Sequence, residues 1–169
     1  SATTRGLKVL GVALGEDLVP AAIDNPKGFW EDREFVGINE ELLQLLGAGS
    51  DRLGLLDWSL PENPAISQLR SRAEEIVRAR CDKCAIWGFK DPRTARLLQF
   101  WQPIFAKVGC DVNYVIVHRN PLSIVESLYE RNNIDSSKAF YLWLEHLIAA
   151  ISKTTGAKRV VVAYDKLLH

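Results

Sequence analysis

The sequence contains no methionine, only three cysteines, and no excess of either charge, with 21 basic and 21 acidic residues. Balanced charge argues against nucleic acid or an anionic membrane as the main partner, so any anion site has to be local. Every apolar run is shorter than the roughly 20 residues of a membrane-spanning helix, and the opening residues lack the pattern of a signal peptide. We therefore expect a soluble, cytoplasmic protein that binds neither nucleic acid nor membrane.

The cysteines are Cys81, Cys84 and Cys110, and an odd number does not fit the disulfide framework of a small secreted protein. Cys81 and Cys84 form a lone CxxC, which fits half a zinc site or a redox pair. No second CxxC or nearby histidine pair completes a set of zinc ligands. We interpret the cysteines as structural and expect no metal.

With 169 residues, 47% of them hydrophobic, the chain is long enough for a sizeable core, and we expect one domain over residues 1–169. Apolar residues recurring every three or four positions predict helices, with Asp32 and Asn63 as N-caps of the second and third. The predicted helices span residues 4–14, 33–46, 64–80, 94–108, 122–131 and 139–151. Continuous apolar runs predict strands at 84–89, 112–117 and 159–164. Apolar strands alternating with helices favour an α/β fold, with three α/β/α layers around a parallel central sheet.

In such sheets ligands bind beyond the carboxyl ends of the strands. Lys90 follows the first predicted strand and offers a point charge to an anion, although a pair with a surface acid fits equally well. Arg119 follows the second strand, directly before a helix whose first turn has free N–H groups. Ser123, Ser127 and Arg131 recur every four residues on that helix. This pattern favours a bound phosphate, and it also fits a solvated helix face.

The chain opens on Ser1, Ala2, Thr3 and Thr4, small and hydroxyl residues that lead into a predicted helix. Such residues are typical of the end of a phosphate-binding loop, and equally of a simple helix cap.

Together these residues resemble the sulfotransferases that use 3′-phosphoadenosine 5′-phosphosulfate (PAPS). Arg119 and Ser127, eight residues apart in RNPLSIVES, are similar to that family's 3′-phosphate motif. SATT resembles the end of its 5′-phosphosulfate loop, with Ala2 in place of the usual glycine and the basic residue lying before Ser1. FKDPRT resembles the Lys-Asp-Pro segment of the tyrosylprotein branch, and DNPKGFWED is similar to a segment of bacterial members.

The resemblance implies a P-loop NTPase-like sulfotransferase fold and metal-free transfer from PAPS to a hydroxyl acceptor such as a carbohydrate, with release of 3′,5′-adenosine bisphosphate (PAP). It implies that Lys90 is the catalytic cation and that six residues bind the donor: Ser1, Ala2, Thr3, Thr4, Arg119 and Ser127. The family's first strand and its glycine-rich C-terminal segment are missing, so we expect the chain to be incomplete at both ends. Pro92 excludes the histidine base that many cytosolic members carry at that position.

A hydroxyl acceptor needs a base. Glu31 is our candidate because some members of the family that the chain resembles use a glutamate, and because it follows Phe29 and Trp30, aromatic neighbours able to exclude water from a carboxyl group. Glu31 also fits a simple helix start, and His118 is the rival base.

Two other functions stay open. RVVVAYD fits the strand that ends in a magnesium-binding Asp in P-loop NTPases, which indicates a P-loop kinase. The second alternative function is that of a non-catalytic nucleotide-binding domain of the same fold.

Overall fold

The computed structural model describes residues 2–23, 25–26, 28–58 and 63–167. Within these ranges the chain has an α/β fold with six α-helices and one sheet of two parallel strands. It divides into two compact units, here called unit 1 (Ser1–Ser50 and Leu56–Asp111) and unit 2 (Asp51–Leu55 and Val112–His169). Across the same ranges, none of the helices has the length and apolar character needed to cross a membrane.

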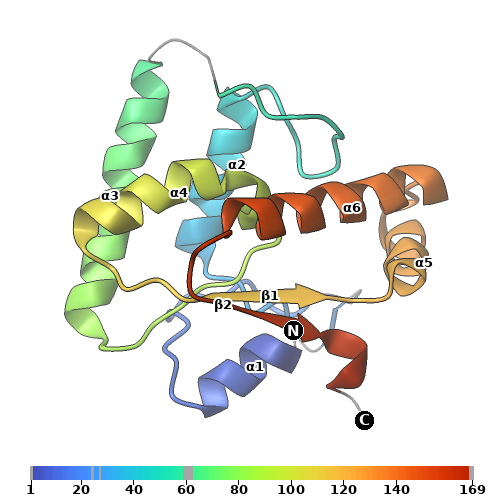
Figure 1. The fold of residues 1–169 in the computed structure, drawn as a ribbon, viewed down its shortest axis with the longest axis horizontal. Coiled ribbons are helices and arrows are strands. Elements are labelled where there is room, and N and C mark those ends of the chain that lie inside the picture. Colours follow the sequence, from blue (N-terminus) through green and yellow to red (C-terminus); the bar gives the residue numbers. More distant parts are fainter. Residues whose placement is uncertain (1, 24, 27, 59–62, 168–169) are drawn as a thin grey trace. The chain divides into compact units, whose positions relative to one another are not determined.

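Unit 1 contains α1 (Ala2–Val9), α2 (Arg33–Leu45), α3 (Pro64–Lys83) and α4 (Thr94–Val108), and α3 packs against both α2 and α4 (Figure 1). Each of the helices α2, α3 and α4 buries one apolar stripe. The fully buried members are Phe35, Ile38, Leu42, Leu69, Ala73, Val77, Leu97, Phe100, Trp101 and Ile104. Burial of each large side chain contributes about 1.5–3 kcal/mol, so this stripe contact is the main force that holds unit 1 together.

Two predicted helix starts in unit 1 are confirmed. The Asp32 side chain accepts a hydrogen bond from the Glu34 N–H at 3.0 Å and begins α2. The Asn63 side chain accepts one from the Ala65 N–H at 2.9 Å and begins α3, with Pro64 in the first position. Each side chain supplies an acceptor to an N–H group that has no partner inside its helix.

The predicted helix over residues 4–14 is too long, because α1 ends at Val9. Gly11 adopts a φ of +94°, and two backbone bonds close the helix end: Gly11 N–H to the Lys8 carbonyl at 3.0 Å and Val12 N–H to the Leu7 carbonyl at 3.1 Å. This pair of bonds is a Schellman motif, which needs a left-handed residue that glycine supplies without steric cost.

The predicted strand at residues 84–89 is wrong. This segment forms one isolated parallel bridge, between Trp87 and Ala13, with Ala13 N–H bonded to the Ile86 carbonyl at 3.1 Å and Gly88 N–H bonded to the Ala13 carbonyl at 2.9 Å. An apolar run becomes a strand only where a neighbour extends the ladder, and here the ladder stops after two bonds.

Unit 2 contains β1 (Tyr114–His118), α5 (Pro121–Asn132), α6 (Ser136–Lys153), β2 (Arg159–Ala163) and the short 3₁₀ helix η1 (Tyr164–Lys166). The two strands pair in parallel, with Tyr114 opposite Arg159 and His118 opposite Ala163. α5 packs against α6, and α6 contacts β1 (Figure 1). The predicted strands at 112–117 and 159–164 and their parallel pairing are thus confirmed to within two residues. Several strand valines are exposed, so coverage of both sheet faces stays a prediction.

Candidate functional site

Lys90 and Glu31, the two residues predicted to be catalytic, meet in unit 1. The Lys90 Nζ forms an ion pair with the Glu31 Oε1, although 59 positions separate the two residues. Glu31 precedes the N-cap of α2 and has only 7% of its surface exposed, and the Lys90 side chain is 33% exposed. The pair therefore has one buried acid and one cation that solvent or a ligand can reach.

The residue before Glu31 has an unusual backbone. Trp30 adopts a φ of +61°, in the left-handed region where a bulky side chain costs about 1–2 kcal/mol. The Lys8 Nζ lies 5.5 Å from the centroid of the Trp30 ring, a cation–π distance. Strained residues of this kind concentrate at functional sites, and this one directly precedes Glu31 in the chain.

Arg93 forms the second cation of the cluster. Its Nη2 lies 3.7 Å from the Glu31 Oε2, its Nη1 lies 2.5 Å from the Glu40 Oε1, and its Nε lies 2.8 Å from the Asp91 Oδ1. Burial acts to lower the pKa of Arg93, but the hydrogen bonds and charges of Asp91 and Glu40 outweigh it and raise the pKa. Arg93 is therefore permanently charged and joins three carboxylates.

Asp91 is held in turn by Asn39, a fully buried residue of α2. The Asn39 Nδ2 donates to the Asp91 Oδ2 at 2.9 Å and to the Thr94 Oγ1 at 3.0 Å, and its Oδ1 accepts from the Trp101 Nε1 at 2.8 Å. Asn39 and Arg93 were not predicted as site residues. A signal for Asn39 exists in the sequence, because it follows Phe35 by four positions and so lies on the buried face of its helix.

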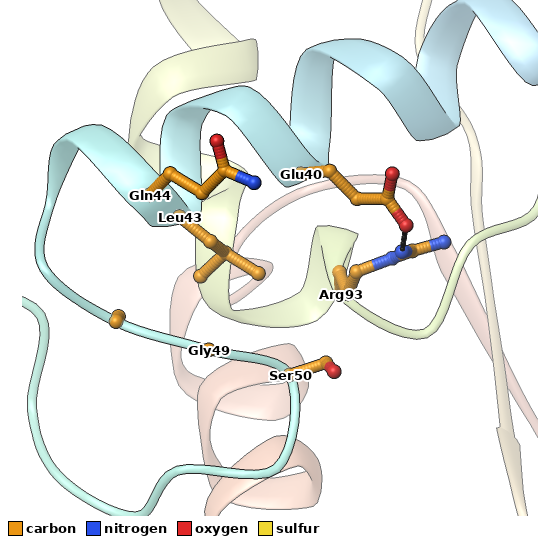
Figure 2. Close-up of a pocket in the computed structure, with 7 residues that line it drawn as sticks. Glu40, Leu43, Gln44, Gly49, Ser50 and Arg93 are labelled. Carbon is orange, nitrogen blue, oxygen red and sulfur yellow. Dashed lines mark hydrogen bonds and ion pairs between the residues drawn. The ribbon is translucent and has the colours of Figure 1, made fainter.

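A pocket of about 200 Å³ opens on one side of Arg93 (Figure 2). Glu40, Leu43 and Gln44 of α2 and the turn at residues 48–50 form its wall. Figure 2 shows the Arg93 guanidinium and the Glu40 carboxylate pointing toward each other. The same guanidinium thus contacts both the pocket wall and Glu31. Two cations, Lys90 and Arg93, face the three carboxylates of Glu31, Asp91 and Glu40, so the cluster carries a formal charge of −1.

A second ion-pair group is formed by Arg80 with Asp32, the residue after Glu31, and with Glu34. The Arg80 Nη2 bonds to the buried Asp32 Oδ2 at 2.8 Å and also contacts the Glu34 carboxylate. Burial acts to lower the pKa of Arg80. The hydrogen bonds and charges of Asp32 and Glu34 outweigh this effect, so the pKa is raised. The Arg80 side chain is only 17% exposed, and its bond to the N-cap residue Asp32 helps to fix the start of α2.

The N-terminal donor residues lie on α1 of unit 1, except for Ser1, which is outside the described residues. Ala2 is exposed and Thr4 is buried. The Thr3 Oγ1 is buried and has no hydrogen-bond partner within the part of the chain that the structure describes. A buried hydroxyl without a partner is unfavourable.

Arg119 and Ser127, predicted to bind the 3′-phosphate, belong to unit 2. Arg119 lies between β1 and α5, with its Nε 3.8 Å from the Asp165 Oδ1 and its guanidinium carbon 5.6 Å from the Tyr164 ring centroid. The Asp165 Oδ2 accepts a hydrogen bond from the Asn120 N–H at 2.8 Å. A carboxylate thus contacts both the arginine that was predicted to bind a phosphate and the N–H of the N-cap residue of α5.

Ser127 is half-buried on α5, and its carbonyl accepts a hydrogen bond from the Arg131 Nε at 3.4 Å, as the four-residue spacing predicts. His118, the rival base, is the last residue of β1 and is also half-buried.

Within the described ranges there is no group of three or more His, Cys, Asp or Glu side chains that could hold a metal ion. No family model matches the chain, and comparison with curated proteins and with solved structures found no match.

Proposed function

We propose that the chain is a sulfotransferase that moves a sulfuryl group from PAPS to a hydroxyl acceptor. The observation that carries this proposal is the ion pair between Lys90 and Glu31, a partly exposed cation against a buried acid. The resemblance to the PAPS-dependent family assigns complementary roles in one reaction to these two residues. The proposal includes the three-layer fold of the PAPS-dependent family, in which β1 and β2 would be two strands of a larger parallel sheet.

Sulfuryl transfer forms a bond from the acceptor oxygen to sulfur and breaks the bond from sulfur to the leaving phosphate. As in phosphoryl transfer, the protein mainly aligns the groups and stabilises the charge that develops on the leaving oxygen. Lys90 supplies that charge stabilisation, and the N–H groups and hydroxyls of Thr3 and Thr4 add hydrogen bonds. The buried Thr3 Oγ1 supports this assignment, because a donor oxygen would satisfy it.

Glu31 takes the proton of the acceptor hydroxyl. In the free chain its charge is paired with Lys90, and the sulfuryl oxygens replace it as the partner of Lys90 when the donor binds. The carboxylate is then available as a base, and Arg93, 3.7 Å away, keeps it in place. For unit 2, the resemblance assigns binding of the donor's 3′-phosphate to Arg119 and Ser127, a contact that positions the donor.

The experiment is transfer of labelled sulfate from PAPS to a panel of phenols and sugars by wild type and three variants. Lys90→Met should lower turnover about a hundredfold or more, as expected for loss of a donor to the developing charge. Glu31→Gln should lower it by about 10²–10⁴. Lys107→Met is the matched control, since it also removes a lysine from a surface ion pair, with Glu74. Transfer that survives Lys90→Met unchanged, or no transfer by wild type to any acceptor, contradicts the proposal.

A further inference from the structure

Two cysteines of unit 1 that lie far apart in the sequence have their sulfur atoms side by side. The Cys81 Sγ and the Cys110 Sγ are 3.5 Å apart, within hydrogen-bond distance for thiols. Cys81 is exposed and Cys110 is half-buried, so solvent reaches the pair. The partner of Cys81 is therefore Cys110, and not Cys84, the other member of the CxxC.

The backbone holds both sulfur positions. Cys81 lies in the last turn of α3, which packs against α4, and the Lys107–Glu74 ion pair at 2.8 Å joins the same two helices. Cys110 follows α4 through a Schellman motif: Gly109 has a φ of +85°, and the Cys110 N–H bonds back to the Phe105 carbonyl at 2.9 Å. Two packed helix ends thus fix the approach of the thiols.

We propose that Cys81 and Cys110 are a reversible disulfide site, oxidised by a small-molecule disulfide such as oxidised glutathione. The thiolate of Cys81 attacks one sulfur of the small disulfide, forms a mixed disulfide, and releases one small thiol. Cys110 then loses its proton to solvent and attacks the Cys81 sulfur, which releases the second small thiol. Two electrons pass from the cysteine pair to the small disulfide, which leaves as two thiols.

The surroundings of the two sulfurs set this order of attack. Burial first, then the hydrogen bond and the charge of Cys81, raise the pKa of Cys110 to about 11. Cys110 is thus protonated at neutral pH and can donate its S–H to Cys81, the more exposed thiol. Formation of the bond shortens the distance between the two sulfurs from 3.5 Å to about 2.05 Å.

The disulfide would close a loop that runs from Cys81 to Cys110 and contains Lys90, Arg93 and all of α4. A closed loop restricts the unfolded chain, so the oxidised form should melt at a higher temperature than the reduced form. This site depends on no assumption about sulfuryl transfer, and its test can succeed or fail independently of that function.

The test is equilibration of wild type, Cys84→Ser and Cys110→Ser in glutathione buffers of increasing oxidised fraction, followed by thiol alkylation and peptide mass spectrometry. Wild type and Cys84→Ser should each lose two thiols together and give a cross-linked peptide containing Cys81 and Cys110, with a raised melting temperature. Cys110→Ser should give glutathionylated Cys81 and no cross-link. A cross-link between Cys81 and Cys84, or glutathionylation of wild type without any cross-link, would overturn the proposal.

Discussion

Gly15 has a φ of +92°, and a Cβ atom built on it would lie 2.0 Å from the Asp32 Oδ2. That carboxylate cannot move easily, because it is buried and bonded to Arg80. We predict that Gly15→Ala lowers the free energy of unfolding by about 2–4 kcal/mol, from backbone strain and the clash together. Urea unfolding measures this loss.

Gly11 provides the control, since its φ is +94° and a Cβ atom built on it would have open space around it, with no heavy atom of the described residues in contact. Gly11→Ala should therefore cost only the strain of a left-handed residue, about 1–2 kcal/mol. Equal losses in the two variants would show that the Asp32 carboxylate does not enforce glycine at position 15.

Asp165 competes for the groups that are proposed to bind the 3′-phosphate, since it contacts Arg119 and the Asn120 N–H. We predict that Asp165→Asn tightens PAP binding by about 1.4-fold to fivefold, because an exposed charge pair is worth about 0.2–1 kcal/mol. Calorimetric titration checks this. Glu130→Gln, which removes one charge from an exposed position of α5, should leave the affinity unchanged. Weaker binding by Asp165→Asn would contradict the competition.

The sequence predicts individual site residues where a chemical role selects the residue type. Lys90 was predicted from the resemblance of FKDPRT to a family segment, and Glu31 from that family's use of glutamate and from its aromatic neighbours; the two side chains meet in the structure. Asn39 and Arg93 were missed because their role is to hold other side chains, and such a role depends on which helices pack together. The proximity of Cys110 to Cys81 was missed for the same reason, since the CxxC spacing relates Cys81 only to Cys84.

At the level of helices and strands, the prediction succeeded where local chemistry decides and failed where a neighbour decides. Caps are local, and Asp32 and Asn63 begin their helices as predicted. The run at 84–89 is apolar enough for a strand, but strand formation needs a partner, and Ala13 supplies only one bridge. The end of α1 is local and could have been predicted from Gly11.

The start of α6 gives a prediction at this level. The Asp135 Oδ1 accepts hydrogen bonds from the Ser137 N–H at 2.9 Å and the Lys138 N–H at 3.2 Å. Asp135→Ala should lower the free energy of unfolding by about 1 kcal/mol, as for other N-cap losses, and Asp135→Asn should retain most of the stability. Urea unfolding of both variants compares them. A loss of the same size in Asp135→Asn would show that negative charge, not the cap bond, is what matters.

For the whole molecule, the titration of Cys110 predicts a change of stability in alkaline solution. Its pKa in the folded chain is about 11, raised from 9.0, so between these values the unfolded state has lost a proton that the folded state keeps. The stability that the protonated Cys110 thiol adds to the folded state is complete below about pH 9 and is lost as the pH rises toward 11. Under reducing conditions, the stability of wild type minus that of Cys110→Ser should therefore fall across this range. A difference that stays constant from about pH 8 to 11 would contradict it.

The chain as a whole carries no net charge, so binding of an anionic nucleotide has to come from local groups. The most direct test is calorimetric titration, in the presence of EDTA, with PAP and with adenosine 5′-monophosphate, which lacks the 3′-phosphate. We predict that PAP binds at least about tenfold more tightly, a difference of about 1.4 kcal/mol, and that Arg119→Ala abolishes this preference. Equal binding of the two nucleotides, or tighter binding of ATP that requires magnesium, would contradict the account.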